Sequence, residues 1–185
     1  MTVLVGPSIK LRPFKLGEFD AYLAASESWF AMEPQEDPRT VRARLKERFD
    51  GSGNWTPAGI EFAIEHADRL VGDIQARTNP AAMPGGVLEI GIELFDESDR
   101  GAGLGSQALR VITSHLFDVR EAHRVQLTTD LDNARMRRAA ERVGFAMEGV
   151  MRAFMPSPKG PRDYALFAMT LEDYKVKRQG WDRQA

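Results

Sequence analysis

The sequence contains no cysteine, and this excludes disulfide bonds, thiolate metal sites and a cysteine nucleophile. Histidine is also scarce. His66, His115 and His123 are scattered along the chain instead of lying four residues apart on one helix face, so we expect no bound metal. A protein without disulfides is compatible with the cytoplasm, which is the location that we expect.

The chain also lacks an excess of either charge and any long apolar run. The formal net charge is -2 and the isoelectric point is about 6.0, whereas domains that bind nucleic acids usually carry a strong positive field. No apolar stretch approaches the roughly 20 residues that cross a bilayer, and the first residues do not resemble a signal peptide. We therefore expect neither nucleic acid nor a membrane as a partner.

The apolar residues that are present are enough for one core. The chain has 185 residues and is 43% hydrophobic, which suits a single domain over residues 1–185. The spacing of apolar residues predicts helices over residues 15–29, 38–50 and 133–143, another after residue 106, and a C-terminal helix capped by Thr170 and Asp173. It predicts strands over residues 9–12, 60–64, 70–76, 87–95, 124–129, 145–155 and 163–169.

The predicted strand over residues 87–95 has two different faces. Its even-numbered residues are aliphatic, whereas Glu89, Gly91 and Glu93 alternate with them on the opposite face. The same alternation is typical of an ordinary half-exposed antiparallel strand, in which both glutamates would only be solvated.

A glycine-rich segment, R-G-A-G-L-G-S over residues 100–106, lies between that strand and a predicted helix. Such a loop can direct successive backbone N–H groups at a phosphate, because glycine allows close approach of the backbone. Arg100 adds a positive charge and Ser106 adds a hydroxyl at the start of the helix. No Gly-Lys-Ser/Thr follows, so the loop is not a P-loop, and its spacing differs from G-x-G-x-x-G. A glycine-capped turn without a ligand is the alternative.

A second motif follows the next predicted strand. Residues 132–145, DNARMRRAAERVGF, place Asn133 and Arg138 on a short helix that Gly144 ends. Together with the glycine loop, the strand L-E-I-G-I-E-L and the early segment I-K-L-R-P-F, this ordered set resembles the GCN5-related N-acetyltransferase (GNAT) superfamily, especially its branch of ribosomal-protein N-terminal acetyltransferases. The resemblance covers residues 9–170 and leaves 171–185 as a C-terminal tail.

The resemblance implies both a fold and a co-substrate. The fold would be α/β (α+β), with a mixed, mostly antiparallel sheet of about seven strands that is flanked by helices and splayed at its middle strands. Acetyl-CoA, or another acyl-CoA, would bind with its pyrophosphate on the glycine loop and its pantetheine arm on the splayed strand. The binding residues implied are Ile92, Glu93, Leu94, Arg100, Gly101, Ala102, Gly103, Leu104, Gly105, Ser106, Asn133 and Arg138.

The reaction implied is acetyl transfer to a primary amine by direct attack in a ternary complex. Glu89 or Glu93 would remove the amine proton through water, with Glu89 nearer the usual base position of the superfamily. An α-amine, with a pKa of about 8, demands less of a carboxylate than a lysine does at about 10.4. The acceptor would be a small molecule or a protein N-terminus, and the family's habit of pairing C-terminal strands suggests a homodimer.

The chain departs from the family pattern at the general acid. Ala140 and Met136 occupy the usual positions, and neither can donate a proton. Water, Tyr164 or Ser157 would have to replace the acid, although a thiol with a pKa of about 8.5 is not a very poor leaving group. This departure motivates a second hypothesis, a catalytically impaired sensor or scaffold that binds acyl-CoA.

A third hypothesis is an enzyme that uses a nicotinamide or another nucleotide. Asp130 ends a predicted strand beyond the glycine loop, near the position where a ribose-binding acid is expected in such folds. The loop spacing and the antiparallel hairpins that precede it argue against a doubly wound sheet.

Two further groups of residues could contact a ligand, but an ordinary structural role is favoured for each. Arg135 and Arg142 share the helix of the second motif and could reach a ribose phosphate, but a solvated helix face is the interpretation that we favour for both. Trp29, Phe30 and Met32 could line an acceptor pocket, but we favour packing.

Overall fold

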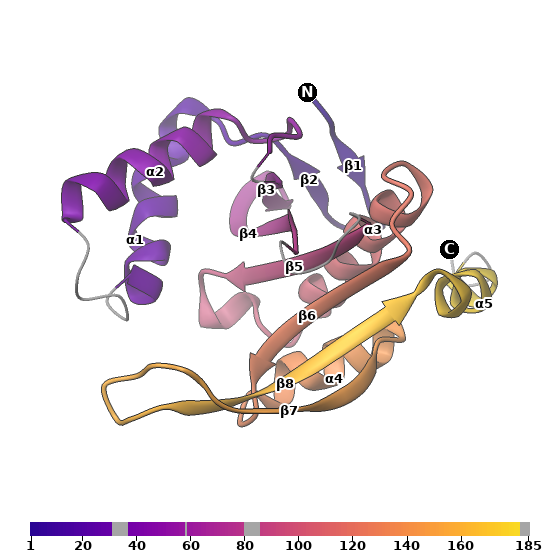
Figure 1. Ribbon diagram of the computed structural model, residues 1–185. Coiled ribbons are helices and arrows are strands. Elements are labelled where there is room, and N and C mark those ends of the chain that lie inside the picture. Colours follow the sequence, from indigo (N-terminus) through magenta and orange to yellow (C-terminus); the bar gives the residue numbers. More distant parts are fainter. Residues whose placement is uncertain (31–36, 58, 80–85, 182–185) are drawn as a thin grey trace.

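The computed structural model describes residues 1–30, 37–57, 59–79 and 86–181, and its framework is one open sheet of eight strands (Figure 1). Neighbouring strands are antiparallel except β5 and β6, which are parallel. In spatial order the strands are β1 (Leu4–Val5), β2 (Lys10–Arg12), β3 (Ile60–His66), β4 (Arg69–Thr78), β5 (Val87–Leu94), β6 (Arg124–Asp130), β8 (Arg162–Thr170) and β7 (Ala146–Met155).

Five α-helices and two short 3-10 helices accompany the sheet in the described ranges. None of these helices is both long and apolar enough to cross a membrane. Their bounds are η1 (Leu16–Glu18), α1 (Phe19–Phe30), α2 (Pro38–Asp50), η2 (Glu97–Asp99), α3 (Leu104–Asp118), α4 (Ala134–Val143) and α5 (Leu171–Trp181).

The predicted fold class, a mostly antiparallel sheet flanked by helices, is confirmed. Each of the seven predicted strands is present, and the eighth is β1, which pairs with β2 through Leu4 and Leu11. Two residues are too few to show an alternating pattern, so this strand had no signal in the sequence.

The helix ends follow local rules. Asp37 caps α2 by accepting a hydrogen bond from the Arg39 backbone N–H at 3.0 Å. Gly144 ends α4 in the left-handed region, with a φ of 109°. At the start of α5, Asp173 accepts from the Thr170 backbone N–H at 3.0 Å, and the Thr170 hydroxyl accepts from the Asp173 N–H at 3.2 Å. The predicted caps of these helices are therefore confirmed.

Helices cover both faces of the sheet (Figure 1). On one face α3 packs its buried side chains, including Leu109, Ile112 and Leu116, against aliphatic residues of the strands to form the main core. On the other face α1 and α2 enclose a smaller cluster around Tyr22 and Phe49. The main core thus lies on the α3 side of the sheet.

The middle of the sheet is splayed. β5 and β6 pair only at Val87–Arg124, Leu88–Val125 and Glu89–Gln126, although both strands continue beyond these positions. From Ile90 onward β5 pairs with β4 alone, and the two ribbons diverge (Figure 1). The predicted splay near Ile92 is confirmed, and it begins directly after Glu89.

The conformation of Gly144 generates a test of the fold. Replacing Gly144 with alanine should destabilise the protein by about 1–2 kcal/mol, because the left-handed region is unfavourable by that amount for a residue with a Cβ. The added Cβ would also lie 2.8 Å from the Lys177 Cγ, in a side chain that can move. Thermal unfolding should show a melting temperature lower by roughly 2–8 °C.

Gly180→Ala is the matched control, because a Cβ at Gly180 in α5 meets no atom within 4 Å. Alanine is the better helix former, so this variant should be as stable as the parent or slightly more stable. Equal stability of Gly144→Ala and the parent would mean that the left-handed helix end is not needed.

Candidate active site

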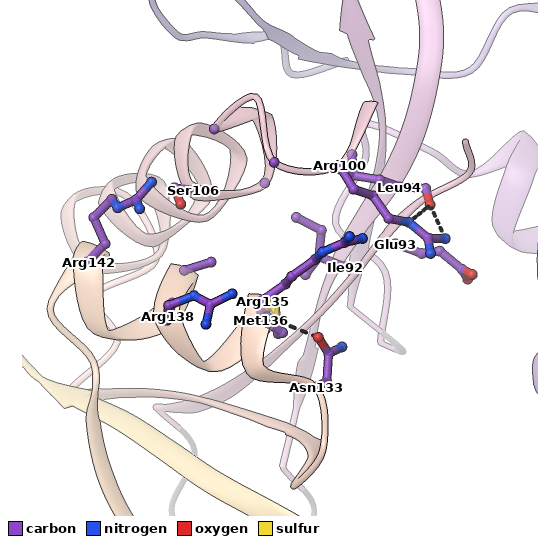
Figure 2. Close-up of a pocket in the computed structure, with 14 residues that line it drawn as sticks. Ile92, Glu93, Leu94, Arg100, Ser106, Asn133, Arg135, Met136, Arg138 and Arg142 are labelled. Atoms are coloured by element: carbon purple, nitrogen blue, oxygen red, sulfur yellow. Dashed lines mark hydrogen bonds between the residues drawn. The ribbon is translucent and has the colours of Figure 1, made fainter. Parts of the chain in front are cut away.

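A cleft of about 600 Å³ opens where β5 leaves β6 (Figure 2). Three segments form its walls: the end of β5, the glycine loop with the start of α3, and α4 with the residue before it. The lining residues are Ile92, Glu93, Leu94, Arg100, Gly101, Gly103, Gly105, Ser106, Asn133, Arg135, Met136, Arg138, Ala139 and Arg142.

The glycine loop needs its glycines for backbone conformation. Gly101 and Gly103 have φ values of 97° and 85°, and a Cβ built on either would meet no atom within 4 Å. Dihedral preference, and not lack of space, therefore selects glycine at both positions. Gly103 is the N-cap of α3, and the first helical hydrogen bond runs from the Gln107 N–H to the Gly103 carbonyl at 3.0 Å.

The start of α3 is suited to an anion. The N–H groups of Leu104, Gly105 and Ser106 precede the first helical hydrogen bond, so they have no acceptor within the helix. Gly105 and Ser106 line the cleft. The helix dipole adds a partial positive charge at the same end. This end of α3 can therefore hold phosphate oxygens at the cleft.

Arg100 joins the loop to β5. It donates hydrogen bonds to the Leu94 carbonyl from Nη2 at 2.9 Å and from Nε at 3.3 Å (Figure 2). The guanidinium is thereby held at the edge of the cleft, between the last residue of the strand and the glycine loop. Arg100, which we expected to bind phosphate, thus also connects two walls of the cleft.

The opposite wall begins with a capping residue. Asn133 caps α4, with its Oδ1 accepting from the Met136 backbone N–H at 3.0 Å (Figure 2). Because the cap uses the oxygen, the amide nitrogen is the atom that Asn133 can offer as a donor to a ligand. Local helix formation therefore orients this residue.

Three arginines of α4 line the same cleft: Arg135, Arg138 and Arg142. We favoured a solvated helix face for Arg135 and Arg142, and both residues are exposed. Both also line the cleft (Figure 2). Arg135 also lies 3.5 Å from Glu97, and both side chains are largely exposed, so this ion pair is weak. The α4 wall is positively charged, which suits an anionic ligand.

Two of the predicted binding residues lie apart from the others. Leu104 is only 2% exposed and packs in the main core, and Ala102 is exposed on the loop. Neither belongs to the described lining of the cleft. Their backbone N–H groups remain the part of each that a loop ligand would use, and their binding role stays a prediction.

The two candidate bases have different surroundings. Glu89 accepts hydrogen bonds from Arg77 at 2.9 Å and from Gln126 at 3.1 Å, beside the last β5–β6 pair. Within the described chain it is not part of the cleft lining, whereas Glu93 is. The Glu93 side chain extends away from the α4 arginines, toward the other face of the sheet (Figure 2). Which of them acts as a base stays a prediction.

Asp73 was not among the predicted site residues; it lies opposite Glu93 on β4 and is 8% exposed. Burial raises the pKa of Asp73 well above its ordinary value, and the neighbouring carboxylates of Glu61 and Glu93 act in the same direction. An aspartate inside the apolar strand segment L-V-G-D-I was the available signal, because a charged residue in such a run is rarely buried without a role.

The residues considered as a general acid are placed as follows. Ala140 is fully buried and Met136 lines the cleft. The Ser157 hydroxyl donates to the Gly160 carbonyl at 2.6 Å, and the Tyr164 ring packs against Phe154. Burial raises the Tyr164 pKa. Neither Ser157 nor Tyr164 is among the described residues that line the cleft, so no general acid is assigned.

The remaining candidate residues are those for a ribose, an acceptor pocket and a metal ion. Asp130 accepts from Arg162 at 2.9 Å and from the Asp132 N–H at 2.8 Å, so its carboxylate is held at the end of β6. Met32 and the side chains of Trp29 and Phe30 lie outside the described residues. In the part of the chain that is described, no group of three or more His, Asp or Glu side chains is arranged to hold a metal ion.

Known proteins resemble this chain in sequence and in fold. A mycothiol acetyltransferase from Salinispora tropica is 32% identical over 139 residues, which are 75% of this chain and 45% of that protein, so the chain spans less than half of that relative. Mycobacterium smegmatis RimJ in complex with CoA-disulfide superposes with a TM-score of 0.70 at 22% identity, over 93% of this chain and 87% of RimJ.

A ribosomal-protein-S5-alanine acetyltransferase from Vibrio fischeri superposes with a TM-score of 0.74 at 17% identity, over 94% of this chain and 99% of that one. At such identities the two superpositions show a shared fold. The sequence itself matches the acetyltransferase (GNAT) domain family over residues 8–146, which include β5, the glycine loop and α4. This protein therefore belongs to the GNAT acetyltransferase family, as its two motifs predicted.

Proposed function

We propose that this protein transfers an acetyl group from acetyl-CoA to a primary amine, by direct attack in a ternary complex. The observation that carries the proposal is the cleft in which the glycine loop, the splayed end of β5 and the α4 arginines meet. One wall offers helix N–H groups and positive charge, and the other offers a strand edge. A nucleotide thioester needs both kinds of wall.

The pyrophosphate of acetyl-CoA would bind at the start of α3. The N–H groups of Leu104, Gly105 and Ser106 supply donors there, and Arg138 faces them from α4. Arg100, which is held at the Leu94 carbonyl, adds charge at the same edge. Charge-assisted hydrogen bonds of this kind are among the strongest that a protein makes to phosphate.

The pantetheine arm would lie along β5. The backbone groups on the β6-facing edge from Ile90 to Leu94 are outside the ladder with β6, so they can pair with the amides of the arm instead. An N–H on this edge could also polarise the thioester carbonyl, where negative charge develops during attack. Splaying of the sheet thus supplies both binding and catalysis.

The chemical step forms one bond and breaks another. The amine nitrogen attacks the thioester carbon, the carbon–sulfur bond breaks, and the sulfur leaves as a thiolate whose conjugate acid has a pKa of about 8.5. The proton lost by the amine passes to a carboxylate, directly or through water. We assign this role to Glu93 in preference to Glu89, because Glu93 lines the cleft and Glu89 is not among its described lining residues.

The acceptor is proposed as an amine of a small molecule or of a protein N-terminus. The similar proteins named above include a mycothiol acetyltransferase and a ribosomal-protein-S5-alanine acetyltransferase, which suggests both classes. An α-amine is favoured over a lysine, because less free energy is needed to remove its proton. Association into a homodimer and a location in the cytoplasm stay predictions.

Binding of acetyl-CoA tests the proposal first. Calorimetric titration should show saturable binding of acetyl-CoA, whereas NADH and ATP should not bind under the same conditions. A signal with NADH or ATP but none with acetyl-CoA would instead support a different nucleotide enzyme.

Turnover is tested by thiol release, corrected for hydrolysis, with a panel of peptides, polyamines and aminoglycosides. An enzyme should turn over at least one acceptor. Binding without any turnover would favour the sensor hypothesis, which the lack of a proton donor at Ala140 and Met136 motivates.

Removing the Arg100 side chain should weaken acetyl-CoA binding by about 1.5–3 kcal/mol, or roughly 10-fold to 150-fold in Kd. The loss combines the charge at the cleft with the bond that holds the loop to β5. Arg152→Ala is the matched control, since Arg152 is exposed on β7 and outside the described lining of the cleft. If Arg100→Ala binds as tightly as the parent, Arg100 does not belong to the site.

Glu93→Gln should lower kcat/KM by about 10²-fold to 10⁴-fold, the usual contribution of a general base, with acetyl-CoA affinity unchanged. Glu89→Gln should have a much smaller effect, because that side chain bonds to Arg77 and Gln126. Steady-state kinetics with the best acceptor of the panel would measure both. The reverse order of effects would move the base to Glu89.

A further inference from the structure

A polar layer covers the face of β3, β4 and β5 that is turned away from the main core. Glu61, Asp73 and Glu93 lie on this face, one on each strand, because each alternates with core residues along its strand. Asp73 is directly opposite Glu93 in the antiparallel ladder of β4 and β5. The Cβ atoms of such a pair are about 4.5–5.5 Å apart, so the two carboxyl groups are within reach of each other.

Two donors from the covering helices are directed at Glu61. Arg48 faces the layer from α2 and donates to Glu61 at 2.9 Å and 3.1 Å, and Tyr22 donates to Glu61 from α1 at 2.8 Å. Of the pair opposite each other, Asp73 is 8% exposed, whereas Glu93 is less buried and belongs to the residues that line the cleft. The two carboxyl groups therefore differ in burial although they share one position in the ladder.

Two carboxyl groups this close cannot both be ionised at low cost in a buried setting. Burial is the main cause that raises the pKa of Asp73; repulsion from Glu61 and Glu93 adds to it, and attraction by Arg48 opposes it. The deeper residue of the pair therefore retains a proton more readily than an ordinary aspartate.

We propose that Asp73 is a positioning residue for the acetyl transfer described above: its protonated carboxyl donates a hydrogen bond to Glu93 and so keeps Glu93 ionised and oriented on this face of β5. This inference rests on the proposed function. During the reaction the acceptor ammonium gives one proton to Glu93, the neutral amine attacks the thioester carbon, and the carbon–sulfur bond breaks. The second proton of the attacking nitrogen passes to the departing thiolate, directly or through water, so the products are the amide and the free thiol. Asp73 keeps its own proton throughout, and Glu93 later releases the transferred proton to water.

The first arm of the test is stability against pH, which needs no acceptor. Urea unfolding of the full chain would be followed from pH 4 to pH 8 for the parent, Asp73→Asn, Glu93→Gln and the double variant. A carboxyl whose folded pKa is raised stabilises the protein fully below its unfolded pKa of about 3.9, and this stabilisation is lost as pH rises toward the folded pKa.

An asparagine side chain cannot titrate, so the parent should lose stability relative to Asp73→Asn as pH rises. The ratio of their unfolding equilibrium constants should change by up to about tenfold per pH unit. This change should be smaller in the Glu93→Gln background, where the repulsion that raises the Asp73 pKa is gone. A difference that does not change with pH would overturn the proposal. So would an equal change in both backgrounds, since burial alone would then hold the proton.

The second arm is the pH profile of kcat/KM with the best acceptor of the panel. Asp73→Ala removes the donor, so the acid limb of the profile, which reports protonation of Glu93, should shift to higher pH. Asp73→Asn keeps a donor and should restore the limb to the position of the parent. A purely structural role predicts instead a rate lowered equally at every pH, and that result would overturn the proposal, as would equal shifts in both variants.

The two arms separate this inference from the proposed function. Failure of the parent to bind acetyl-CoA, or to turn over any acceptor, would reject the proposed function. The unfolding measurements would still decide whether Asp73 holds a proton beside Glu93. If acetyl transfer is observed and the stability difference between Asp73→Asn and the parent does not change with pH, the proposed function stands. The positioning role of Asp73 is then wrong.

Discussion

The short ladder between β5 and β6 is the constraint on which the rest of the site depends. Three residue pairs join the strands, and after Glu89 they separate while β5 stays paired with β4. A sheet paired along its whole length would have no opening at its centre, and the edge of β5 would have no backbone groups to offer. A ligand that pairs with these groups can offset the cost of leaving them outside the ladder. The start of α3 and the α4 wall line the same opening.

Beyond the splay the two faces of β5 differ in charge. On one side Ile92 and Leu94 lie next to Gly105, and the α4 arginines face them across the cleft. On the other side Glu93 continues into a layer that contains Glu61 and Asp73. An anionic co-substrate and a cationic amine would thus approach one strand from opposite faces. A shared strand brings the two reactants together without a large movement of the protein.

Local signals predicted much of this structure because their causes are local. Asp37, Gly144 and the pair Thr170–Asp173 act within a few residues of themselves, so the helix ends could be foreseen. The glycine loop was recognised for the same reason, since the φ values of Gly101 and Gly103 are properties of the loop. The two-residue β1 was missed because its stability comes from pairing with β2, and a pairing has no pattern in a segment so short.

The sequence alone determined the order of elements, the glycine loop between β5 and α3, and the motif residues Asn133 and Arg138, because spacing along the chain is enough to define them. The tertiary structure decided what these residues face. Arg135 and Arg142 are exposed and also line the cleft, Glu89 is paired away from it, and Asp73 lies opposite Glu93. The physical reason is that burial, strand register and the divergence of two strands depend on residues distant in sequence. A pattern within one segment carries no information on them.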